Sequence, residues 1–112
     1  MKKVILESPY AGDIILNIEY ARACVRDCLL RGETPFASHL LYTQEGILND
    51  EIPEEREHGI NAGFVWREVS EATVVYTDLG VSRGMLYGIE HAHKLEHPVE
   101  LRTLGGKWSK SE

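Results

Sequence analysis

Hydroxyl, aromatic and charged side chains cluster just after three apolar runs of the sequence, each with the composition of a β-strand. Serine and tyrosine hydroxyls can hydrogen-bond a sugar or a phosphate, and tyrosine rings offer flat faces to a nucleobase. Glycines let a ligand approach the backbone, and the start of a helix favours an anion. These features predict a site for a nucleotide-like small molecule. Its candidate residues are Ser8, Pro9, Tyr10, Ala11 and Gly12 after the first run, Ser38, His39 and Tyr42 after the second, and Asp78, Ser82, Arg83, Gly84 and Met85 after the third.

Three of these residues have more specific expected roles. Asp78 ends a buried strand, where a carboxylate is costly without a partner, so we expect it to accept hydrogen bonds from a ribose diol. Arg83 can pair with a phosphate. His39 either hydrogen-bonds a phosphate or a base, or has a packing role, and the serines either contact the ligand or cap helices.

The elements that must position these residues alternate between strand and helix patterns. Strands are predicted over 3–8, 72–78 and 97–102, with a shorter one near 35–37. Helices are predicted between Asp13 and Gly32, capped by Asp13 or Asn17, from Pro53 to about Glu71, and over 82–96. This order predicts an α/β fold, a small doubly wound, Rossmann-like parallel sheet of about four to five strands with helices on both faces. Ligands bind such sheets beyond the carboxyl ends of the strands, where the strand order reverses.

The composition bounds the class of protein. The 112 residues suit a single domain, expected over 1–104, and a polar tail over 105–112 that is either mobile or reaches a neighbouring chain through Trp108. A net charge of −6 without a basic cluster argues against nucleic-acid binding. The N-terminus has the pattern of neither a signal peptide nor a membrane span, so we expect a cytoplasmic protein with no membrane partner.

The cysteines and two of the histidines have structural explanations. Cys24 and Cys28 are expected to be reduced and packed within the first helix. His93 and His97 share a helical face, but no third ligand is apparent in the sequence. Neither a metal nor a cofactor is therefore expected.

Two glycines fall on one face of the predicted helix after Pro53. Gly59 and Gly63 each cost about 1 kcal/mol of helix propensity relative to alanine, so close approach of another element is expected. That element is either the sheet or another subunit, and an exposed Trp66 would favour a subunit interface and a homo-oligomer. The preceding loop, residues 43–52, is a candidate lid.

Taken together, five segments of the chain resemble the nucleoside 2-deoxyribosyltransferase-like superfamily, and more closely its small bacteriophage members. The segments are "ILESPYAGD", "NIEYAR", "PFASHLLYTQ", "IPEEREHGINAG" and "YTDLGVSRGMLYGIEHA". The resemblance implies a doubly wound α/β fold, a nucleoside or nucleotide site at the strand ends, and oligomers in which one subunit completes its neighbour's pocket. For a phage protein the expected location is the host cytoplasm.

The resemblance also implies a position for a catalytic nucleophile. The transferases carry a glutamate four residues after a helical glycine, and aligning that glycine with Gly84 places the glutamate position on Gly88. Glu90 lies about 200° further around the helix and is expected to point away from the pocket. Only Glu90, Asp78 or a neighbouring subunit's carboxylate could then act as nucleophile. The glycine is also expected to enlarge the pocket.

The sequence therefore favours a protein that binds a nucleotide derivative without transforming it. The expected ligand is an ADP-ribose-type molecule or another signalling nucleotide, and the expected use is a phage sponge against bacterial immune signalling. The alternatives are a nucleoside or nucleotide N-glycosidase or 2-deoxyribosyltransferase, and a protein-interaction module.

Overall fold

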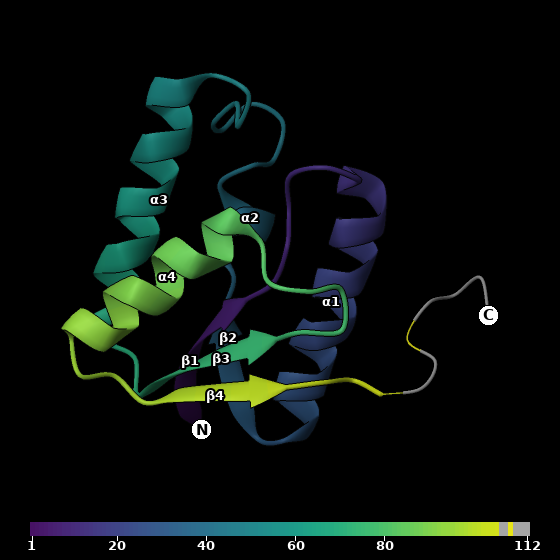
Figure 1. Ribbon diagram of the computed structural model, residues 1–112, viewed down its shortest axis with the longest axis vertical. Coiled ribbons are helices and arrows are strands. Elements are labelled where there is room, and N and C mark those ends of the chain that lie inside the picture. Colours follow the sequence, from purple (N-terminus) through teal and green to yellow (C-terminus); the bar gives the residue numbers. More distant parts are fainter. Residues whose placement is uncertain (106–107, 109–112) are drawn as a thin grey trace.

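Four parallel strands form the central sheet, in the order β2-β1-β3-β4 (Figure 1). The computed structural model describes residues 1–105 and residue 108. The predicted α/β fold is confirmed, with four strands. The elements are β1 (Lys2–Glu7), α1 (Ile14–Leu30), β2 (Glu33–Phe36), α2 (Ser38–Leu41), α3 (Pro53–Arg67), β3 (Ala72–Tyr76), α4 (Arg83–Lys94) and β4 (Val99–Arg102).

The two central strands are buried on both sides. Every residue of β3 is buried, and β1 buries Val4, Ile5 and Leu6 in succession. Continuous apolar runs of this kind belong to parallel strands covered on both faces. Since β1 pairs with β2 on one side and with β3 on the other, the strand order reverses between β1 and β3. Their carboxyl ends mark the place where a ligand site is expected.

Helices cover the sheet on both faces. Figure 1 shows α1 on one side and α3 and α4 on the other. The core on the α1 side includes both free, buried cysteines, as predicted. Because alternate strand residues face opposite ways, Ile5 and Glu7 point to the side of α3 and α4, away from Leu6. No helix of the described residues is long and apolar enough to cross a membrane.

Local capping explains where two of the helices begin. The carboxylate of Asp13 accepts a hydrogen bond from the Leu16 amide at 3.2 Å, so Asp13 is the N-cap of α1. The Ser82 hydroxyl accepts one from the Met85 amide at 3.3 Å and begins α4. The helix predicted to reach Glu71 ends earlier, at Arg67, because the following residues turn into the sheet, where the Glu71 amide bonds to the Lys3 carbonyl at 2.8 Å.

The glycine face of α3 packs against α2 and the loop that follows it. A Cβ on Gly63 would lie 3.0 Å from Cβ and Oγ of Ser38, and one on Gly59 would lie 3.3 Å from a methyl of Leu48. The expectation of close approach is therefore confirmed, but the partner is neither the sheet nor, at these two positions, another subunit. These contacts set the wall of the cavity described below.

The predicted tail lies mostly outside the described residues, which include only Gly105 and Trp108 of residues 105–112. The Trp108 ring packs edge-to-face on Tyr20, with ring centroids 4.9 Å apart. Trp108 therefore has an aromatic partner within its own chain.

Candidate functional site

A cavity of about 180 Å³ opens at the carboxyl ends of β1 and β3. Its walls come from the segment after β1, from α2 and the following loop, from α3, and from the first turn of α4. It therefore lies at the reversal of strand order, as predicted. The lining residues are Glu7, Ser8, Tyr10, Ala11, Ser38, His39, Tyr42, Thr43, Leu48, Asp50, Glu55, Arg56, Gly59, Ile60, Ser82, Arg83, Gly84 and Met85.

The structure brings most of the predicted site residues together. All of them line the cavity except Pro9, Gly12 and Asp78. Gly12, at a φ of +102°, lines a wider depression that shares a wall with the cavity. That depression lies between the segment after β1 and residues 43–56, and the two hollows have seven lining residues in common, Tyr10, Ala11, Thr43, Leu48, Asp50, Glu55 and Arg56.

Asp78 does not belong to the site, which corrects its predicted role. Its carboxylate accepts hydrogen bonds from the Tyr20 hydroxyl at 2.6 Å and from the amides of Leu104 and Gly105 at 2.9 and 3.2 Å. These bonds lower the pKa of Asp78 against the effect of its burial. The partner that a strand-end carboxylate requires is therefore the segment after β4, not a ribose.

Glu90 also lies outside the cavity. Its carboxylate is 3.7 Å from the Lys94 ammonium, and the side chain is two-thirds exposed. This agrees with the rotation expected from the helix geometry. Neither of the two carboxylates that the sequence offered as nucleophiles within this chain therefore lines the site.

A third carboxylate, which the sequence did not single out, lines the cavity. Glu7 is the last residue of β1, and its side chain is 15% exposed. Its Oε2 accepts from Nη2 of the buried Arg67 of α3, which also donates from Nε to the Thr73 hydroxyl and contacts Nδ1 of His91. Burial raises the pKa of Glu7 to about 7, although the Arg67 charge and hydrogen bond act in the opposite direction.

The Glu7 carboxylate fills the space beside Gly88. A Cβ built on Gly88 would have Oε1 of Glu7 at 2.8 Å, with Oε2 and the carboxyl carbon closer still. Gly88 is buried, and it is absent from the cavity lining. The expectation that this glycine enlarges the pocket is therefore wrong, because a carboxylate from β1 takes the volume.

Ser8 and His39 form a polar pair beside Glu7. The Ser8 hydroxyl lies 2.7 Å from Nε2 of His39. Burial lowers the pKa of His39 to about 4, so the imidazole is neutral at pH 7. A neutral ring holds the hydroxyl in place by accepting from it or donating to it, and adds no charge to the site.

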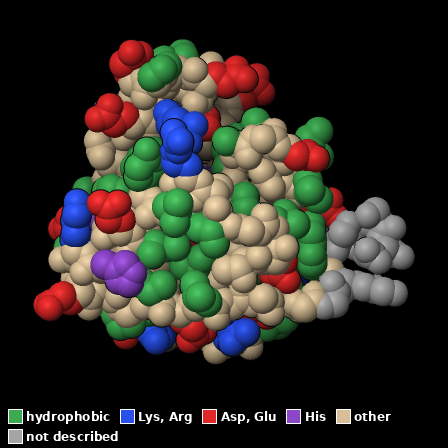
Figure 2. All heavy atoms as spheres, in the orientation of Figure 1, with side chains coloured by type: hydrophobic (Ala, Val, Ile, Leu, Met, Phe, Trp, Pro, Cys, Tyr) green, Lys and Arg blue, Asp and Glu red, His purple; other side chains and the backbone are tan. Residues whose placement is uncertain are grey.

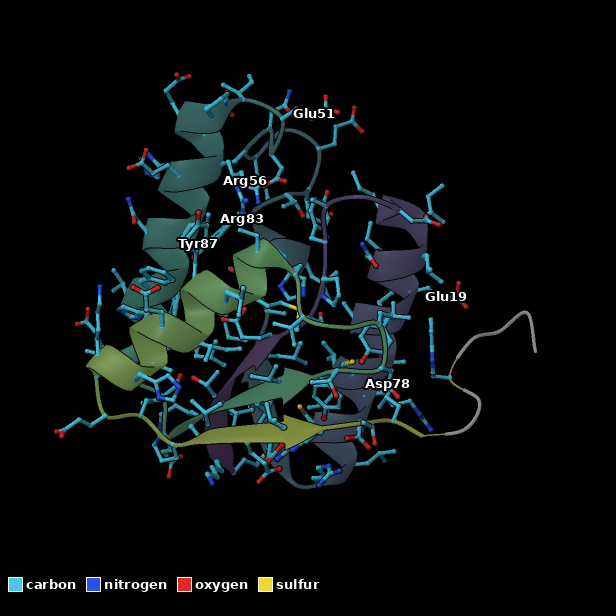
Figure 3. The ribbon with its side chains drawn as sticks, viewed as in Figure 1. Glu19, Glu51, Arg56, Asp78, Arg83 and Tyr87 are labelled. Atoms are coloured by element: carbon cyan, nitrogen blue, oxygen red, sulfur yellow. The ribbon has the colours of Figure 1, made fainter. Side chains whose placement is uncertain are left out.

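Two further arginines border the cavity. Arg56 of α3 and Arg83 of α4 both line it, and among the described residues neither forms an ion pair. A Cβ on Gly84 would lie 3.9 Å from Nη2 of Arg56, so the Arg56 guanidinium reaches the first turn of α4. Figure 2 shows a compact cluster of basic atoms in the upper part of the face, where Figure 3 places Arg56 and Arg83 between α3 and the start of α4. Positive side chains and free helix amides therefore converge.

Within the described part of the chain, no three histidine, cysteine, aspartate or glutamate side chains group closely enough to hold a metal ion. The site offers instead hydroxyls, aromatic rings, two arginines, the buried carboxylate of Glu7 and the carboxylates of Asp50 and Glu55. This is a set of groups for binding an anion attached to a polar ring.

Comparison with solved structures supports the fold. The structure of a 2-deoxyribosyltransferase from the psychrotolerant bacterium Bacillus psychrosaccharolyticus, described as a biocatalyst for nucleoside synthesis, matches with a TM-score of 0.61. The match covers 94% of this chain and 74% of that chain, at 19% sequence identity. No curated protein sequence matches the chain. The model of a family described as a domain of unknown function, DUF7768, matches residues 2–102, and the chain therefore belongs to that family.

Proposed function

We propose that the strand-end cavity binds a nucleotide. The observation that carries this proposal is a pair of guanidiniums, Arg56 and Arg83, beside the N-terminus of the twelve-residue helix α4. Neither has an ion partner in the part of the chain that the structure describes. Two arginines and a helix N-terminus in one place suit a phosphate group. The fold shared with an enzyme of nucleoside synthesis is consistent with such a ligand.

The remaining lining residues suit a sugar and a base. The Ser8 hydroxyl, fixed by His39, can bond to a sugar hydroxyl. Tyr42 is held by the Trp66 indole, which donates to its hydroxyl at 2.9 Å, so its ring is a rigid apolar surface. Asp50 and Glu55 can accept hydrogen bonds from a ribose diol, which is the role predicted for Asp78.

The adjoining depression gives room for a ligand larger than a mononucleotide. It shares Arg56 and Tyr10 with the cavity and extends under residues 43–52. This arrangement supports the finer proposal of an ADP-ribose-type ligand, in which a second phosphate and sugar extend beyond the first. We further propose that the chain sequesters such a signalling nucleotide, as a phage sponge in the host cytoplasm, and that a homo-oligomer completes the depression. The sponge role rests on the resemblance to small phage proteins.

A direct test is a thermal-shift series with nucleosides, nucleoside 5′-monophosphates, ADP-ribose and NAD. A ligand that binds only the folded state raises the melting temperature. We expect the phosphorylated compounds to raise it and the nucleosides to do so weakly. The double variant R56A/R83A should lose the response, whereas R26A, an exposed arginine on α1, should keep it. A phosphate response that persists in R56A/R83A, or no response in the wild-type protein, would refute the proposal.

A second function, cleavage or transfer of an N-glycosidic bond, is favoured by one observation. The expectation of a non-catalytic protein rested on the lack of a carboxylate near residue 88, but Glu7 lies there. Binding and catalysis therefore share one site, and the role of Glu7 decides between retention of the ligand and its conversion.

A further inference from the structure

The buried pair Glu7 and Gly88 joins the end of β1 to the middle of α4. Gly88 is the sixth residue of a twelve-residue helix, where glycine is unfavourable relative to alanine. The Glu7 carboxylate accounts for it, because any Cβ at residue 88 would overlap that carboxylate. At residue 88 the helix thus has no side chain, and the Glu7 side chain of the strand fills the space beside it.

The position of the carboxylate allows contact with a ligand. Glu7 lines the cavity, whereas its partner Arg67 does not. Arg67 donates to Oε2, and no hydrogen bond of the described residues reaches Oε1. Arg67 therefore holds Oε2 in place. Oε1 belongs to a side chain that lines the cavity.

From this geometry we infer that Glu7 is a catalytic carboxylate that attacks the anomeric carbon of the bound nucleotide. The inference rests on the proposed nucleotide site and on the second of the two functions above, so conversion of the ligand takes the place of its sequestration. It places the reacting group on β1 in this chain instead of at residue 88 of α4. The phosphate at Arg56 and Arg83 would fix one end of the substrate, and the Ser8 hydroxyl would hold the sugar between that end and Glu7.

The reaction balances with water as the only co-reactant. A Glu7 oxygen forms a bond to C1′ while the C1′–N bond breaks, and the electron pair leaves with the base, which takes a proton from solvent. Water then attacks C1′, the ester bond to Glu7 breaks, and the remaining proton of the attacking water returns to solvent. The products are a free base and a sugar 5′-phosphate. A second base in place of water gives transfer instead of hydrolysis.

The ionisation of Glu7 is compatible with this role. Its pKa of about 7 leaves a substantial fraction as carboxylate at neutral pH, and Arg67 stabilises that charged form. The neutral His39 beside Ser8 adds no competing positive charge.

The test follows base release and binding in parallel. Wild-type protein is incubated with ribo- and deoxyribonucleoside 5′-monophosphates, ADP-ribose and NAD, and free base is measured by chromatography. We expect E7Q, which keeps an acceptor for Arg67, to retain the thermal shift and to lose base release by at least about 100-fold. The control E90Q should release base at the wild-type rate, because Glu90 is exposed on the far side of α4.

A variant that moves the carboxylate from β1 to α4 distinguishes loss of the carboxylate from loss of the folded structure. E7A/G88E removes the strand carboxylate, clears the overlap, and returns a carboxylate from the helix. We expect it to recover part of the base release that E7A loses. Mass spectrometry of the wild-type protein, quenched in acid, should find a sugar-phosphate adduct on the tryptic peptide of residues 4–22, localised to Glu7 and not to Glu19 or Asp13.

The outcomes separate the two proposals. Nucleotide binding without base release or adduct in the wild-type protein overturns the role of Glu7 and leaves the binding site standing. Base release that persists in E7Q also overturns it. Absence of any thermal shift and of any base release removes the nucleotide site itself, and the role of Glu7 with it.

Discussion

Arg102 at the end of β4 forms a two-pronged ion pair with Glu33 at the start of β2. Nη1 donates to Oε1 at 2.7 Å and Nη2 to Oε2 at 2.6 Å, and both side chains are nearly buried. The pair links the two edge strands of the sheet, 69 residues apart in the sequence. Since α1 also contributes Cys28 beside the guanidinium, this contact ties the α1 side of the core together.

Breaking that ion pair is expected to destabilise the fold strongly. E33Q should lower the free energy of unfolding by up to about 3 kcal/mol, because the buried Arg102 then keeps only the half-exposed carboxylate of Glu100 as a counter-charge. The hydrogen bond and charge of Arg102 lower the pKa of Glu33, so its contribution is present above pH 4.5 and is lost as the pH falls. Urea unfolding at pH 7 and at pH 3.5 measures both effects. E90Q, which breaks an exposed pair, should change stability by less than about 1 kcal/mol.

Glu7 should affect stability with the opposite sign. Its pKa rises from 4.5 to about 7 in the folded protein, so the unfolding free energy should fall as the pH rises from 4.5 to 7, by on the order of 3 kcal/mol. Arg67 of α3 faces the carboxylate and stays charged over this range. His91 of α4 contacts Arg67, and burial and the Arg67 charge lower its pKa, so His91 can titrate in the same experiment. The difference in unfolding free energy between wild type and E7Q isolates Glu7. A difference that does not change over this range would contradict the raised pKa.

The steric overlap at residue 88 predicts that G88A has opposite effects on stability in the wild-type protein and in an E7A variant. In the wild-type protein G88A should destabilise by about 1–3 kcal/mol, because its methyl group meets the Glu7 carboxylate. In an E7A background the same change should stabilise by up to about 1 kcal/mol, since alanine favours the helix. A double-mutant cycle by urea unfolding measures the coupling. Equal effects of G88A in both backgrounds would show that the two residues do not compete for space.

Asp78 should matter for the C-terminal segment and not for ligand binding. D78A removes the acceptor of the Leu104 and Gly105 amides and of the Tyr20 hydroxyl. We therefore expect the free energy of unfolding to fall by about 1–3 kcal/mol. The fluorescence of Trp108, which packs on Tyr20, should change, and a W66F background isolates that signal. Nucleotide-induced thermal shifts should persist. A loss of these shifts at temperatures where D78A is folded would return Asp78 to the site.

The fold could be predicted because its signals are local. The all-buried β3, the capped start of α1 and the alternation of strands with helices are visible in short windows of sequence. The cavity position followed from general sheet topology, and most of its lining follows strand ends.

The roles of Asp78 and Glu7 could not be predicted from the sequence, because the partners of both carboxylates are distant in the chain. Asp78 has the pattern of a ligand residue, but the amides that satisfy it come from residues after β4. Glu7 has the pattern of a polar strand end, and only packing brings it to Arg67, sixty residues away, and to Gly88. A charged residue that closes a buried strand next to the predicted site was the one available signal.

The matched pair at residues 7 and 88 also restricts the order in which these positions can evolve. A glutamate gained at 88 while Glu7 remains would force two carboxylates into one buried space, and the loss of Glu7 alone would leave Arg67 without its counter-charge. Each of these two substitutions is thus disfavoured by itself, although the two together are not. Within the family, large residues at both positions in one sequence should therefore be rare, as expected for an epistatic pair.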